Sequence, residues 1–557
     1  MNSCYLKQLE KLRKAFPAPI SDPVHDGYVV FSLLRALDQV DSLKSMAPIL
    51  GEPKEADYVQ ASVEKYPQNG IALEDVLPQL VEYLEGMHIW GHPCSQINVA
   101  CPPTIASVIG MVLPSLYNPN LCSDENARRF AEIEVRVTAM IADLLGYDQE
   151  RIGGLFTFGG TGTIFYGAKI GLEKAQPGTF EKGLTNDAVL VASQQSHYAS
   201  YSVAGWLGIG CDNVVKVRTH HDNAMDLSHL ESELRRLIED GKKIACVTAT
   251  MGTTDAFGVD DLHGIYLLRE KLVEEYRLHY VPHIHADAVI GWAWSVFKGY
   301  DYHQNRHGFR GRTIRAIAAV ERKIQHLHLA DSLGIDFHKT GFTPYVSSMV
   351  LVKEQKDFQY INRDREKMPY LYHSGSYHPG MYTLETTRSA AGPMAALANL
   401  IHLGREGLQV LLGHAVEMSE TLREQLGSYP ELTVFNDQNS GPVTLFRAYP
   451  TNVDTFELKK KELSDERFRE HLCLYNEFNR RIFTRIHELA LVGEGVDIGL
   501  TECYRLSDYG EPIVALKTYV LSPFTDENRM QEITDQVLAA QTAVEKEMEQ
   551  ELALLTN

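Results

Sequence analysis

The amino-acid sequence predicts an α/β protein with a mainly parallel sheet and one site at an edge of that sheet. From about residue 150, short apolar runs alternate with amphipathic helical patterns, which is typical of a parallel sheet covered by helices. Residues that can bind ligands or take part in catalysis follow these runs. Ligands of such sheets bind beyond the carboxyl ends of the strands. The strand-like runs are 155–158, 188–192, 214–217, 244–249, 281–285 and 349–352.

Helical patterns fill the intervals and both ends of the chain. Apolar residues recur at helical spacing over 128–145, where Gly146 is placed as the C-terminal stop. Further helices are expected over 164–173, 227–239, 262–276, 390–403 and 407–427. Short strands are expected near 432–435, 443–446 and 513–520, before a long final helix from about residue 526. The predicted organisation is a helical N-terminal segment (1–90), a large domain (91–395) and a smaller α+β domain (396–557).

Composition and charge exclude several classes of function. The formal net charge of the 557 residues is −20, which argues against nucleic acid as a general partner. No run of about 18 apolar residues exists, so no membrane span is expected. The N-terminal helix lacks the apolar core of a signal peptide, and the eight cysteines show no CxxC pair. These features favour a cytoplasmic protein with reduced thiols, without a disulfide frame or a metal site.

The most distinctive segment of the sequence contains a lysine directly after an apolar run. In Asp331–Phe342 an apolar run leads to His338 and Lys339, and Thr340 and Gly341 follow at once. Burial disfavours the ammonium form, and a lysine that is partly neutral near pH 7 can form a Schiff base with a carbonyl group. The alternative is a lysine that extends its ammonium group to the surface. The residues at the other strand ends decide between these interpretations.

Four further groups of small or polar residues follow strand-like runs. Gly159–Thr163 opens a helix and could cradle a phosphate, although it could also be a glycine-rich turn. His197 could stack on a planar ring or move protons, or be a hydrogen-bonded structural residue. Thr250 lies among small hydroxyl residues that leave room for a ligand. Asp287 ends an apolar strand, where a carboxylate needs a cation or donors, which a structural ion pair could also supply.

Together these groups are the parts that hold pyridoxal 5'-phosphate (PLP). A lysine bonds to the aldehyde of this cofactor, and a helix start holds its phosphate. A carboxylate keeps the pyridine nitrogen protonated, so that the ring withdraws electrons. Each group is common by itself, but four of them in this order indicate a single cofactor site.

The segments resemble those of the group II PLP-dependent amino-acid decarboxylases, which include glutamate, aromatic-amino-acid and bacterial tyrosine decarboxylases. They stand in the family's order as GGLFTFGGTGT (153–163), SQQSHY (193–198), TATMGTT (248–254), HADA (285–288) and ADSLGIDFHK (330–339). The resemblance covers about residues 85 to 425. It implies the aspartate-aminotransferase-like fold type I, with a mainly parallel seven-stranded sheet in the large domain. It also implies a homodimer with the site at the interface.

The resemblance implies roles for individual residues. Lys339 would form the Schiff base, Asp287 would pair with the pyridinium, and His197 would stack on the ring. Thr250 would lie near the 3-oxygen side of the cofactor. The phosphate contacts would come from Thr161, Gly162, Thr163 and His338.

A further matching segment bears on proton transfer. PYLYHS (369–374) resembles the mobile loop that closes over the site in this family, usually from the partner subunit, and the family tyrosine aligns best with Tyr370. Its phenol could protonate the substrate carbon after CO2 leaves, together with His197. A phenylalanine at this position is associated with oxidative aldehyde formation, so Tyr370 favours plain decarboxylation. Tyr372 could be the working residue instead, and either tyrosine could be a packed aromatic.

Several residues are candidates for contact with the substrate. Lys517 aligns with an arginine that commonly meets the α-carboxylate in the family, and a lysine supplies the charge without the bidentate fork. Arg388 is another candidate for a carboxylate or phosphate contact. The segment that resembles the substrate-side loop supplies His92 and Ser95, with Gln96 and Asn98 beyond.

The predicted activity is the decarboxylation of an L-amino acid to an amine and CO2. The long interval between Asp287 and Lys339 resembles that of the bacterial tyrosine enzymes, which favours an aromatic substrate. Glutamate or aspartate is the alternative and would need a second cation, from Arg388 or from the basic insertion at 298–323. That insertion could equally be a solvated or interface helix. The remaining alternatives are an aldehyde synthase or carbon–carbon lyase with the same cofactor, and a scaffold without activity.

Overall fold

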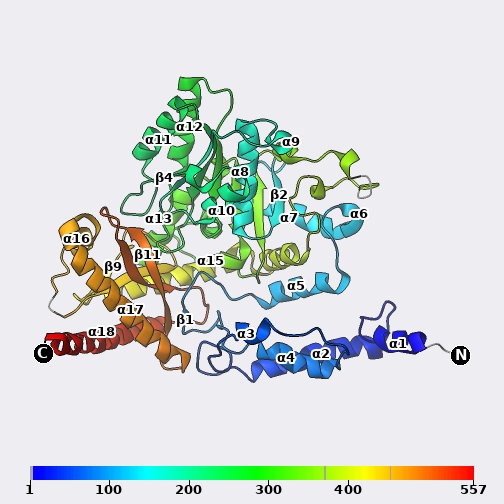
Figure 1. The fold of residues 1–557 in the computed structure, drawn as a ribbon, viewed down its shortest axis with the longest axis horizontal. Helices are drawn as coiled ribbons and strands as arrows, with labels where there is room; N and C mark the ends of the chain where they lie inside the picture. The colour runs from blue at the N-terminus through cyan, green and yellow to red at the C-terminus, as the bar shows by residue number, and fades with distance from the viewer. Residues whose placement is uncertain (1–3, 369–371, 452, 557) are drawn as a thin grey trace.

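A seven-stranded sheet forms the centre of the molecule (Figure 1). The computed structural model describes residues 4–368, 372–451 and 453–556. The strand order is β2-β8-β7-β6-β5-β3-β4, in which β8 runs antiparallel to both neighbours and the other pairs are parallel. The strands are β2 (Gly153–Thr157), β3 (Ala188–Ser193), β4 (Val214–Val217), β5 (Lys243–Thr250), β6 (His283–Asp287), β7 (Ser332–Asp336) and β8 (Ser348–Val352). The predicted α/β fold with a mainly parallel seven-stranded sheet is confirmed.

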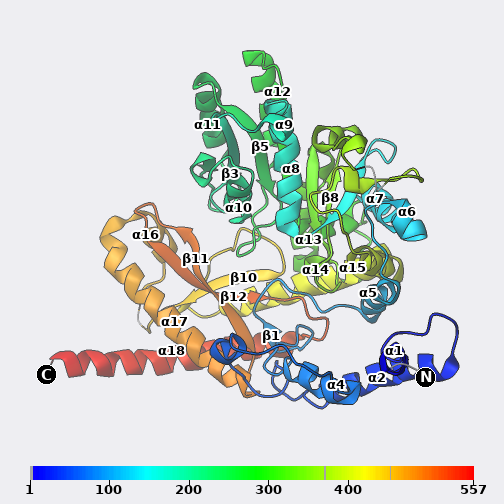
Figure 2. The same cartoon turned by 45° about the vertical axis from the view of Figure 1, so that its right-hand side comes forward.

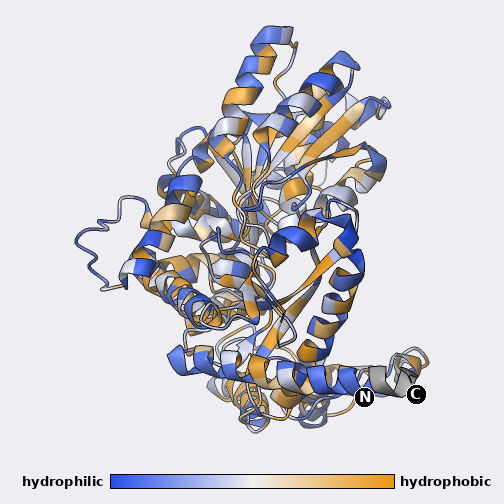
Figure 3. Ribbon diagram, turned by 90° about the vertical axis from the view of Figure 1, so that its left-hand side faces the viewer, coloured by the Kyte–Doolittle hydropathy of each residue, from blue (hydrophilic) through white to orange (hydrophobic). Residues whose placement is uncertain are grey.

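Helices cover both faces of this sheet. Along β3, Val189 and Val191 pack into a core shared with α7 (Ala131–Leu145), whereas Ala188 and Leu190 pack on the other face against α8 (Gly160–Ala175) and α10 (Ala199–Trp206). Because both faces are buried, the strands are continuously apolar rather than alternating. Figure 3 shows this difference, with largely hydrophobic strands and helices of mixed character. The other covering helices are α10 (Ala199–Trp206), α11 (Leu227–Glu239), α12 (Leu262–Tyr276) and α13 (Gly311–Ile324).

The helix α8 (Gly160–Ala175) lies unusually close to the sheet because two of its glycines face the strands. A Cβ at Gly171 would stand 2.1 Å from the carbonyl oxygen of Ala245, and a Cβ at Gly167 would stand 2.5 Å from Nδ1 of His285. The helix therefore packs on β5 and β6 almost backbone to backbone. Its N-terminus directly follows β2, at the edge where the parallel strands end.

Several helix boundaries agree with the predictions. The helices α11 and α12 have the predicted bounds, and each begins after an aspartate, Asp226 or Asp261, whose carboxylate accepts hydrogen bonds from the first turn. The helix α7 ends at Gly146, which adopts a left-handed conformation with φ 87°.

Other boundaries differ from the predictions. The two helices predicted after residue 390 form one element, α15 (Ala391–Leu426), whose backbone leaves the helical region at Gly404 with φ 59°. The strand predicted from residue 281 begins at His283. The apolar run before Lys339, for which no strand was predicted, is β7 in the middle of the sheet.

A second, five-stranded sheet stands beside the first (Figure 2). Its order is β1-β11-β12-β10-β9, and β1 (Ser95–Gln96) pairs in parallel with β11. Ser95 thus joins the sheet of the C-terminal part, although the predicted boundaries assign it to the large domain; those boundaries stay a prediction. The other elements are β9 (Leu432–Val434), β10 (Val443–Ala448), β11 (Asp497–Leu506), β12 (Pro512–Tyr519), α16 (Leu458–Ser464), α17 (Arg469–Leu491) and α18 (Glu527–Thr556).

The N-terminal helices form an elongated arm along one side of the molecule (Figure 1). The arm comprises α1 (Cys4–Arg13), α2 (Pro23–Asp41), α3 (Tyr58–Ala61) and α4 (Leu73–Glu82), and α5 (Ile105–Tyr117) leads from it to the large sheet. The remaining short helices are α6 (Asp124–Ala127), α9 (Thr179–Lys182) and α14 (Phe337–Thr340). Within the described ranges, no helix is long and apolar enough to cross a membrane.

The basic insertion at 298–323 makes ion pairs within the chain. It leads into α13, which packs beside α15. Arg312 pairs with Glu420 at 2.9 Å, and Lys323 pairs with Asp222 at 3.1 Å. Partly exposed pairs of this kind contribute little stability, but they neutralise the charges of Arg312 and Lys323. The geometry favours the interpretation as an interface helix over that of a guide for an anionic ligand.

Candidate active site

The residues predicted to share a site follow neighbouring strands of the large sheet. Thr250 is the last residue of β5 and stands beside Asp287, the last residue of β6. Asp287 in turn stands beside Gly334 of β7, from which the chain leads to Lys339. His197 follows β3. Because the carboxyl ends of parallel strands meet at one edge, the fold brings these side chains together.

Lys339 lies inside the protein rather than at its surface. It is on the short helix α14, and its side chain is 19% exposed. The Nζ atom lies 3.0 Å from Oδ2 of Asp336, a buried carboxylate that also accepts a hydrogen bond of 2.6 Å from Oγ of Ser348. The lysine is therefore held by a counter-ion at the end of β7, and the alternative of an ammonium group extended into water is not what the structure shows.

Asp287 is a buried carboxylate that accepts a hydrogen bond from the backbone of Val289 but keeps one oxygen without a partner in the described ranges. Its Oδ1 atom has no hydrogen-bond partner among the described residues. Burial raises the pKa of Asp287 to about 6, and the negative charge of Asp336 acts in the same direction, whereas the positive charge of Lys339 opposes them. An unsatisfied buried carboxylate costs free energy unless a donor meets it. A structural ion pair was the alternative explanation for Asp287, but among the described residues its Oδ1 atom makes no such pair.

The glycine-rich segment after β2 forms an open helix start. Gly159 has φ 123°, and a Cβ at this position would meet no atom within 4 Å. Gly160 begins α8 without a side-chain cap, so the first N–H groups of the helix can face an anion. Thr161 is exposed, but the Oγ1 atom of the fully buried Thr163 donates to the carbonyl oxygen of Gly160 at 2.7 Å. The hydroxyl of Thr163 is therefore used within the helix, contrary to its predicted phosphate contact.

His197 is a neutral imidazole near Lys339. Burial lowers the pKa of His197, and the positive charge of Lys339 lowers it further. Its Nδ1 atom accepts a hydrogen bond of 3.1 Å from the backbone N–H of Ala199, which fixes the orientation of the ring. A neutral, oriented ring is suited to stacking on a flat ligand.

Thr250 is held between two side chains. Its hydroxyl lies 2.9 Å from Oγ of Ser196, and its backbone N–H donates to Oδ2 of Asp260 at 2.7 Å. Burial raises the pKa of Asp260 to about 7. Asp260 also accepts a hydrogen bond from the backbone N–H of Met225, so it fixes the loop after β5.

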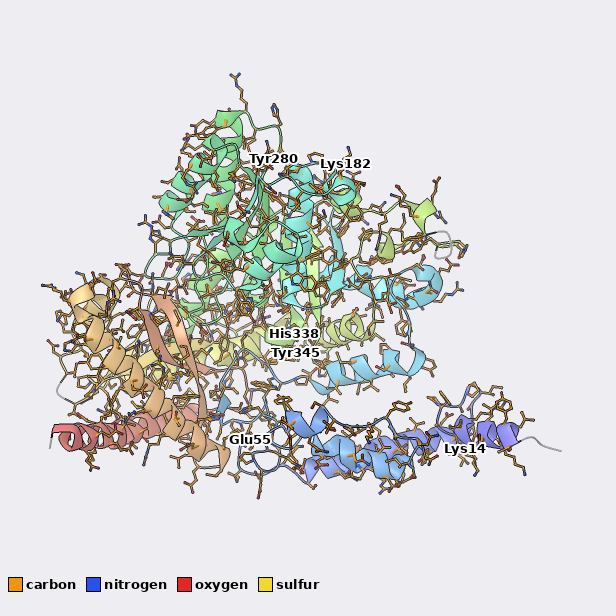
Figure 4. All side chains as sticks on the ribbon, in the orientation of Figure 1. Lys14, Glu55, Lys182, Tyr280, His338 and Tyr345 are labelled. Atoms are coloured by element: carbon orange, nitrogen blue, oxygen red, sulfur yellow. The ribbon has the colours of Figure 1, made fainter. Side chains whose placement is uncertain are left out.

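His338 lies beside Lys339 on the side of the glycine-rich segment. Its Nε2 atom is 3.5 Å from Oδ2 of Asp336, and a Cβ at Gly160 would lie 2.9 Å from the same oxygen. Its ring centroid is 4.3 Å from that of Tyr345, and both residues lie near the centre of the molecule (Figure 4). Burial lowers the pKa of His338.

Lys517 reaches toward this site from the smaller sheet. Its Nζ atom lies 2.8 Å from Oδ1 of Asp255, which is in the loop after β5. Of the two predicted substrate-side residues, Ser95 is buried and its hydroxyl has no partner among the described residues. His92 accepts a hydrogen bond on Nδ1 from the N–H of Cys94, and burial lowers its pKa.

Arg388 is committed to a structural role. It is 4% exposed, and its guanidinium makes an ion pair through two donors with the buried Glu134. It also donates to the carbonyl oxygens of Leu121 and Phe156. This geometry corrects the predicted substrate contact, because the pair with Glu134 occupies the guanidinium.

The segment that resembles the family loop is anchored on α6. Residues 369–371, and with them Tyr370, lie outside the described residues. The backbone N–H groups of His373 and Ser374 donate to Glu125, while those of Ser376 and Tyr377 donate to Asp124. Tyr372 is 3% exposed, with its ring centroid 5.1 Å from that of His378. It is thus packed at the base of the loop.

Comparisons with known proteins agree with this geometry. Residues 58–448 match the pyridoxal-dependent decarboxylase conserved domain, which is more than half of the chain. The chain belongs to this family. It is 23% identical over 421 residues to an L-2,4-diaminobutyrate decarboxylase of Acinetobacter baumannii, a match covering 72% of this chain and 76% of that protein. It is 26% identical over 314 residues to an L-tyrosine decarboxylase of Enterococcus faecium, covering 52% and 48%.

A solved structure supports the fold assignment. The glutamate decarboxylase domain of a diaminobutyrate-pyruvate transaminase and L-2,4-diaminobutyrate decarboxylase from Vibrio parahaemolyticus superposes with a TM-score of 0.73. The sequence identity is 18%, and the match covers 96% of this chain and 99% of that chain. The decarboxylase therefore has the fold type I of PLP enzymes. It is a carboxy-lyase that acts on amino acids with PLP as its cofactor.

The residues of this decarboxylase fit the cofactor. The unpartnered Oδ1 atom of the buried Asp287 can accept the N–H of a pyridinium ring. The open helix start at Gly159 and Gly160 can take the phosphate, and His338 lies on that side. Lys339 could supply the amine for the aldehyde, and the neutral ring of His197 could stack on the cofactor.

Two acidic residues of the candidate site were not identified from the sequence. Asp336 stands three positions before Lys339, a spacing that places both on one turn of a helix, so the signal was present. Asp255 lies within the loop after Thr250, but its partner Lys517 is 262 positions away. No local sequence pattern predicts such a pair.

Proposed function

We propose that this decarboxylase removes the α-carboxylate of an L-amino acid as CO2 and returns a proton to the α-carbon, which releases the amine. The observation that carries the proposal is the unpartnered, buried Oδ1 atom of Asp287, one strand away from the run that leads to Lys339. A carboxylate with this environment can hold a proton on the ring nitrogen of the cofactor.

Each residue of the site has a proposed role. With PLP bound, Lys339 would supply the amine that holds the cofactor aldehyde, and Asp336 would keep that amine in position. Bound PLP supplies an acceptor for the electron pair that CO2 leaves behind. His197 holds the ring plane, and Lys517 binds the substrate α-carboxylate through its charge.

A survey of substrates tests the proposal. The purified holoenzyme is incubated with each of the twenty common L-amino acids, with L-ornithine, with L-2,4-diaminobutyrate and with L-dihydroxyphenylalanine, and CO2, amine and peroxide are measured. Equimolar CO2 and amine without peroxide is the expected result. Peroxide and aldehyde in place of amine would instead support the aldehyde synthase, and products without CO2 would support the carbon–carbon lyase.

The aromatic substrate favoured by the sequence stays a prediction. The relatives act on substrates as different as diaminobutyrate and tyrosine, and all of them are distant in sequence. The comparisons thus support the reaction but do not choose between its substrates. The cytoplasmic location also stays a prediction; all eight cysteines lie in the described residues and each is unpaired.

We expect Tyr370 to supply the proton that returns to the α-carbon, because Tyr372 is packed against His378 at the base of the loop. In Tyr370→Phe, amine formation should fall about 100-fold, the loss expected for a missing general acid. Without the returning proton, O2 and water would oxidise the decarboxylated substrate, so that aldehyde, ammonia and peroxide accumulate. Product analysis by mass spectrometry with a peroxide assay measures this change.

The matched control is Tyr372→Phe, which removes a phenol from the same segment. This variant should keep amine as its product. Amine as the main product of Tyr370→Phe, together with aldehyde from Tyr372→Phe, would transfer the role to Tyr372.

A homodimer is part of the proposal, and the helix α5 supports it. One face of α5 packs closely on α15, where a Cβ at Gly110 would stand 2.8 Å from the carbonyl oxygen of Met394. The other face exposes a row of apolar side chains. These are Ile105, Val108, Ile109, Val112, Leu113 and Leu116. A continuous apolar face on a long helix is typical of a protein interface, and a second copy of this chain is its proposed partner.

Ile109→Glu should therefore dissociate the dimer, because it buries a charge in the proposed interface. Sedimentation velocity of the wild type and the variant measures the effect. Leu267→Glu is the control, since Leu267 is an equally exposed leucine on α12, away from α5. A wild-type monomer, or an Ile109→Glu dimer as stable as the wild type, would contradict the proposed interface.

A further inference from the structure

The cation proposed to bind the substrate is paired with an acid that comes from a different part of the fold. Asp255 lies in the loop after β5 of the large sheet, and Lys517 lies on β12 of the smaller sheet. The Nζ atom of Lys517 is 2.8 Å from Oδ1 of Asp255. The other carboxylate oxygen, Oδ2, accepts a hydrogen bond of 2.8 Å from Oγ1 of Thr501 on β11. The loop after β5 thus presents a fixed negative charge where the two sheets meet.

Asp255 belongs to the same electrostatic environment as the cofactor residues. Its negative charge raises the pKa of His197, and the charge of Lys339 acts on the same imidazole in the opposite direction. Its side chain is 28% exposed, whereas that of Lys517 is 9% exposed. The carboxylate is therefore the more accessible member of the pair.

Binding of a substrate changes the charge balance of this pair. An amino acid places its α-carboxylate against Lys517, which then shares its charge between two carboxylates. The negative charge of Asp255 is then only partly neutralised by Lys517 in a largely buried environment. This is unfavourable unless a second cation binds near Asp255. A positively charged group on the substrate restores the balance.

We infer that the substrate carries an ammonium group on its side chain, and that Asp255 binds this group beside the α-carboxylate held by Lys517. The inference rests on the proposed function and names its substrate class, the short aliphatic diamino acids. The two protein groups lie within hydrogen-bond distance of each other, so a short, flexible side chain can bring its ammonium group to Asp255.

The other substrate classes fit this pair less well. A side-chain carboxylate, as in glutamate or aspartate, would lie near the negative charge of Asp255 and be repelled. The second cation expected for such a substrate from Arg388 is occupied by Glu134. An aromatic side chain would leave Asp255 without a new partner.

The test compares substrates that differ only in charge. Holoenzyme is assayed for CO2 release with L-2,4-diaminobutyrate, L-ornithine and L-lysine, with the uncharged L-norvaline, and with L-glutamate and L-tyrosine. A diamino acid should have the highest kcat/KM. In Asp255→Asn, the kcat/KM for that diamino acid should fall about 30-fold relative to that for norvaline, which is the size expected for one charge-assisted hydrogen bond.

Two further variants separate recognition from structure. Asp255→Glu keeps the charge and should restore part of the selectivity. Asp222→Asn removes a carboxylate that pairs with Lys323 outside the site, and it should leave the selectivity unchanged. Binding is also followed through the cofactor absorbance, which reports on diamino acids and norvaline even without turnover.

The outcomes distinguish this inference from the proposed function. Decarboxylation of tyrosine or glutamate in preference to every diamino acid would overturn the inference and leave the reaction intact. Equal selectivity of wild type and Asp255→Asn would also overturn it, because Asp255 would then be only a structural partner of Lys517. If no amino acid lost CO2, the proposed reaction would fail. Tighter binding of a diamino acid than of norvaline, lost in Asp255→Asn, would still support recognition by Asp255.

Discussion

Replacement of Lys339 by alanine should reduce CO2 release by about four orders of magnitude, the loss typical of a missing covalent nucleophile. Lys339 follows β7, the neighbour of the strand that ends in Asp287, and Asp336 holds its Nζ atom at 3.0 Å. Without it, PLP can bind only through contacts with its phosphate, its ring and its nitrogen. The variant should therefore also lose the yellow, borohydride-sensitive attachment of the cofactor. Radiometric CO2 release and absorbance after dialysis measure the two effects.

Lys216 provides the control for this substitution. It lies on β4, and burial lowers its pKa to about 8, which makes it the competing candidate for a reactive amine near His197. Lys216→Ala should keep the covalent attachment of the cofactor. Full turnover by Lys339→Ala, or loss of attachment only in Lys216→Ala, would refute the assignment of Lys339.

Replacement of Asp287 by asparagine should have the second largest effect. An amide cannot hold a proton on the ring nitrogen through a negative charge, so the cofactor withdraws electrons less strongly. We expect kcat to fall about 100- to 1,000-fold, similar to the loss of one preorganised electrostatic contact. Lys339 is intact in this variant, so borohydride should still fix the cofactor. Turnover near that of the wild type would show that Asp287 does not act on the ring.

The same variant gives a test of stability in the cofactor-free protein. Because the pKa of Asp287 is raised to about 6 in the folded protein, its contribution to stability is present at low pH and is lost as the pH rises through that value. From about pH 4 to about pH 7, the free energy of unfolding of the wild type should fall by about 2 kcal/mol relative to that of Asp287→Asn. Denaturant titrations at several pH values measure this difference, and a constant difference would show that the carboxylate is not desolvated.

The sequence predicted the elements whose signals are local. The helices α11 and α12 both follow capping aspartates, and their bounds agree with the prediction, although only α11 is strongly amphipathic. The strand β7 was missed because its apolar run was interpreted only through the lysine that follows it. The strand β1 was missed because two residues carry no pattern of their own, and their partners on β11 lie about four hundred positions later.

At the site, too, features with local sequence signals were predicted and features that depend on distant residues were not. The segments around His197, Thr250, Asp287 and Lys339 predicted one shared edge, because each follows a strand of the sheet. The role of Arg388 was wrongly inferred, since Glu134, which pairs with it, lies 254 positions earlier. A pairing over such a distance is decided by packing and leaves no trace in local sequence.

The identity of the lysine that bonds to the cofactor is the central claim, and one measurement tests it directly. Holoenzyme is reduced with borohydride and digested, and the peptide that carries the phosphopyridoxyl group is located by mass spectrometry. The group should be found on Lys339, in the peptide that contains Asp336 and His338. A group on Lys216 or Lys517 instead, with Lys339 unmodified, would contradict the account.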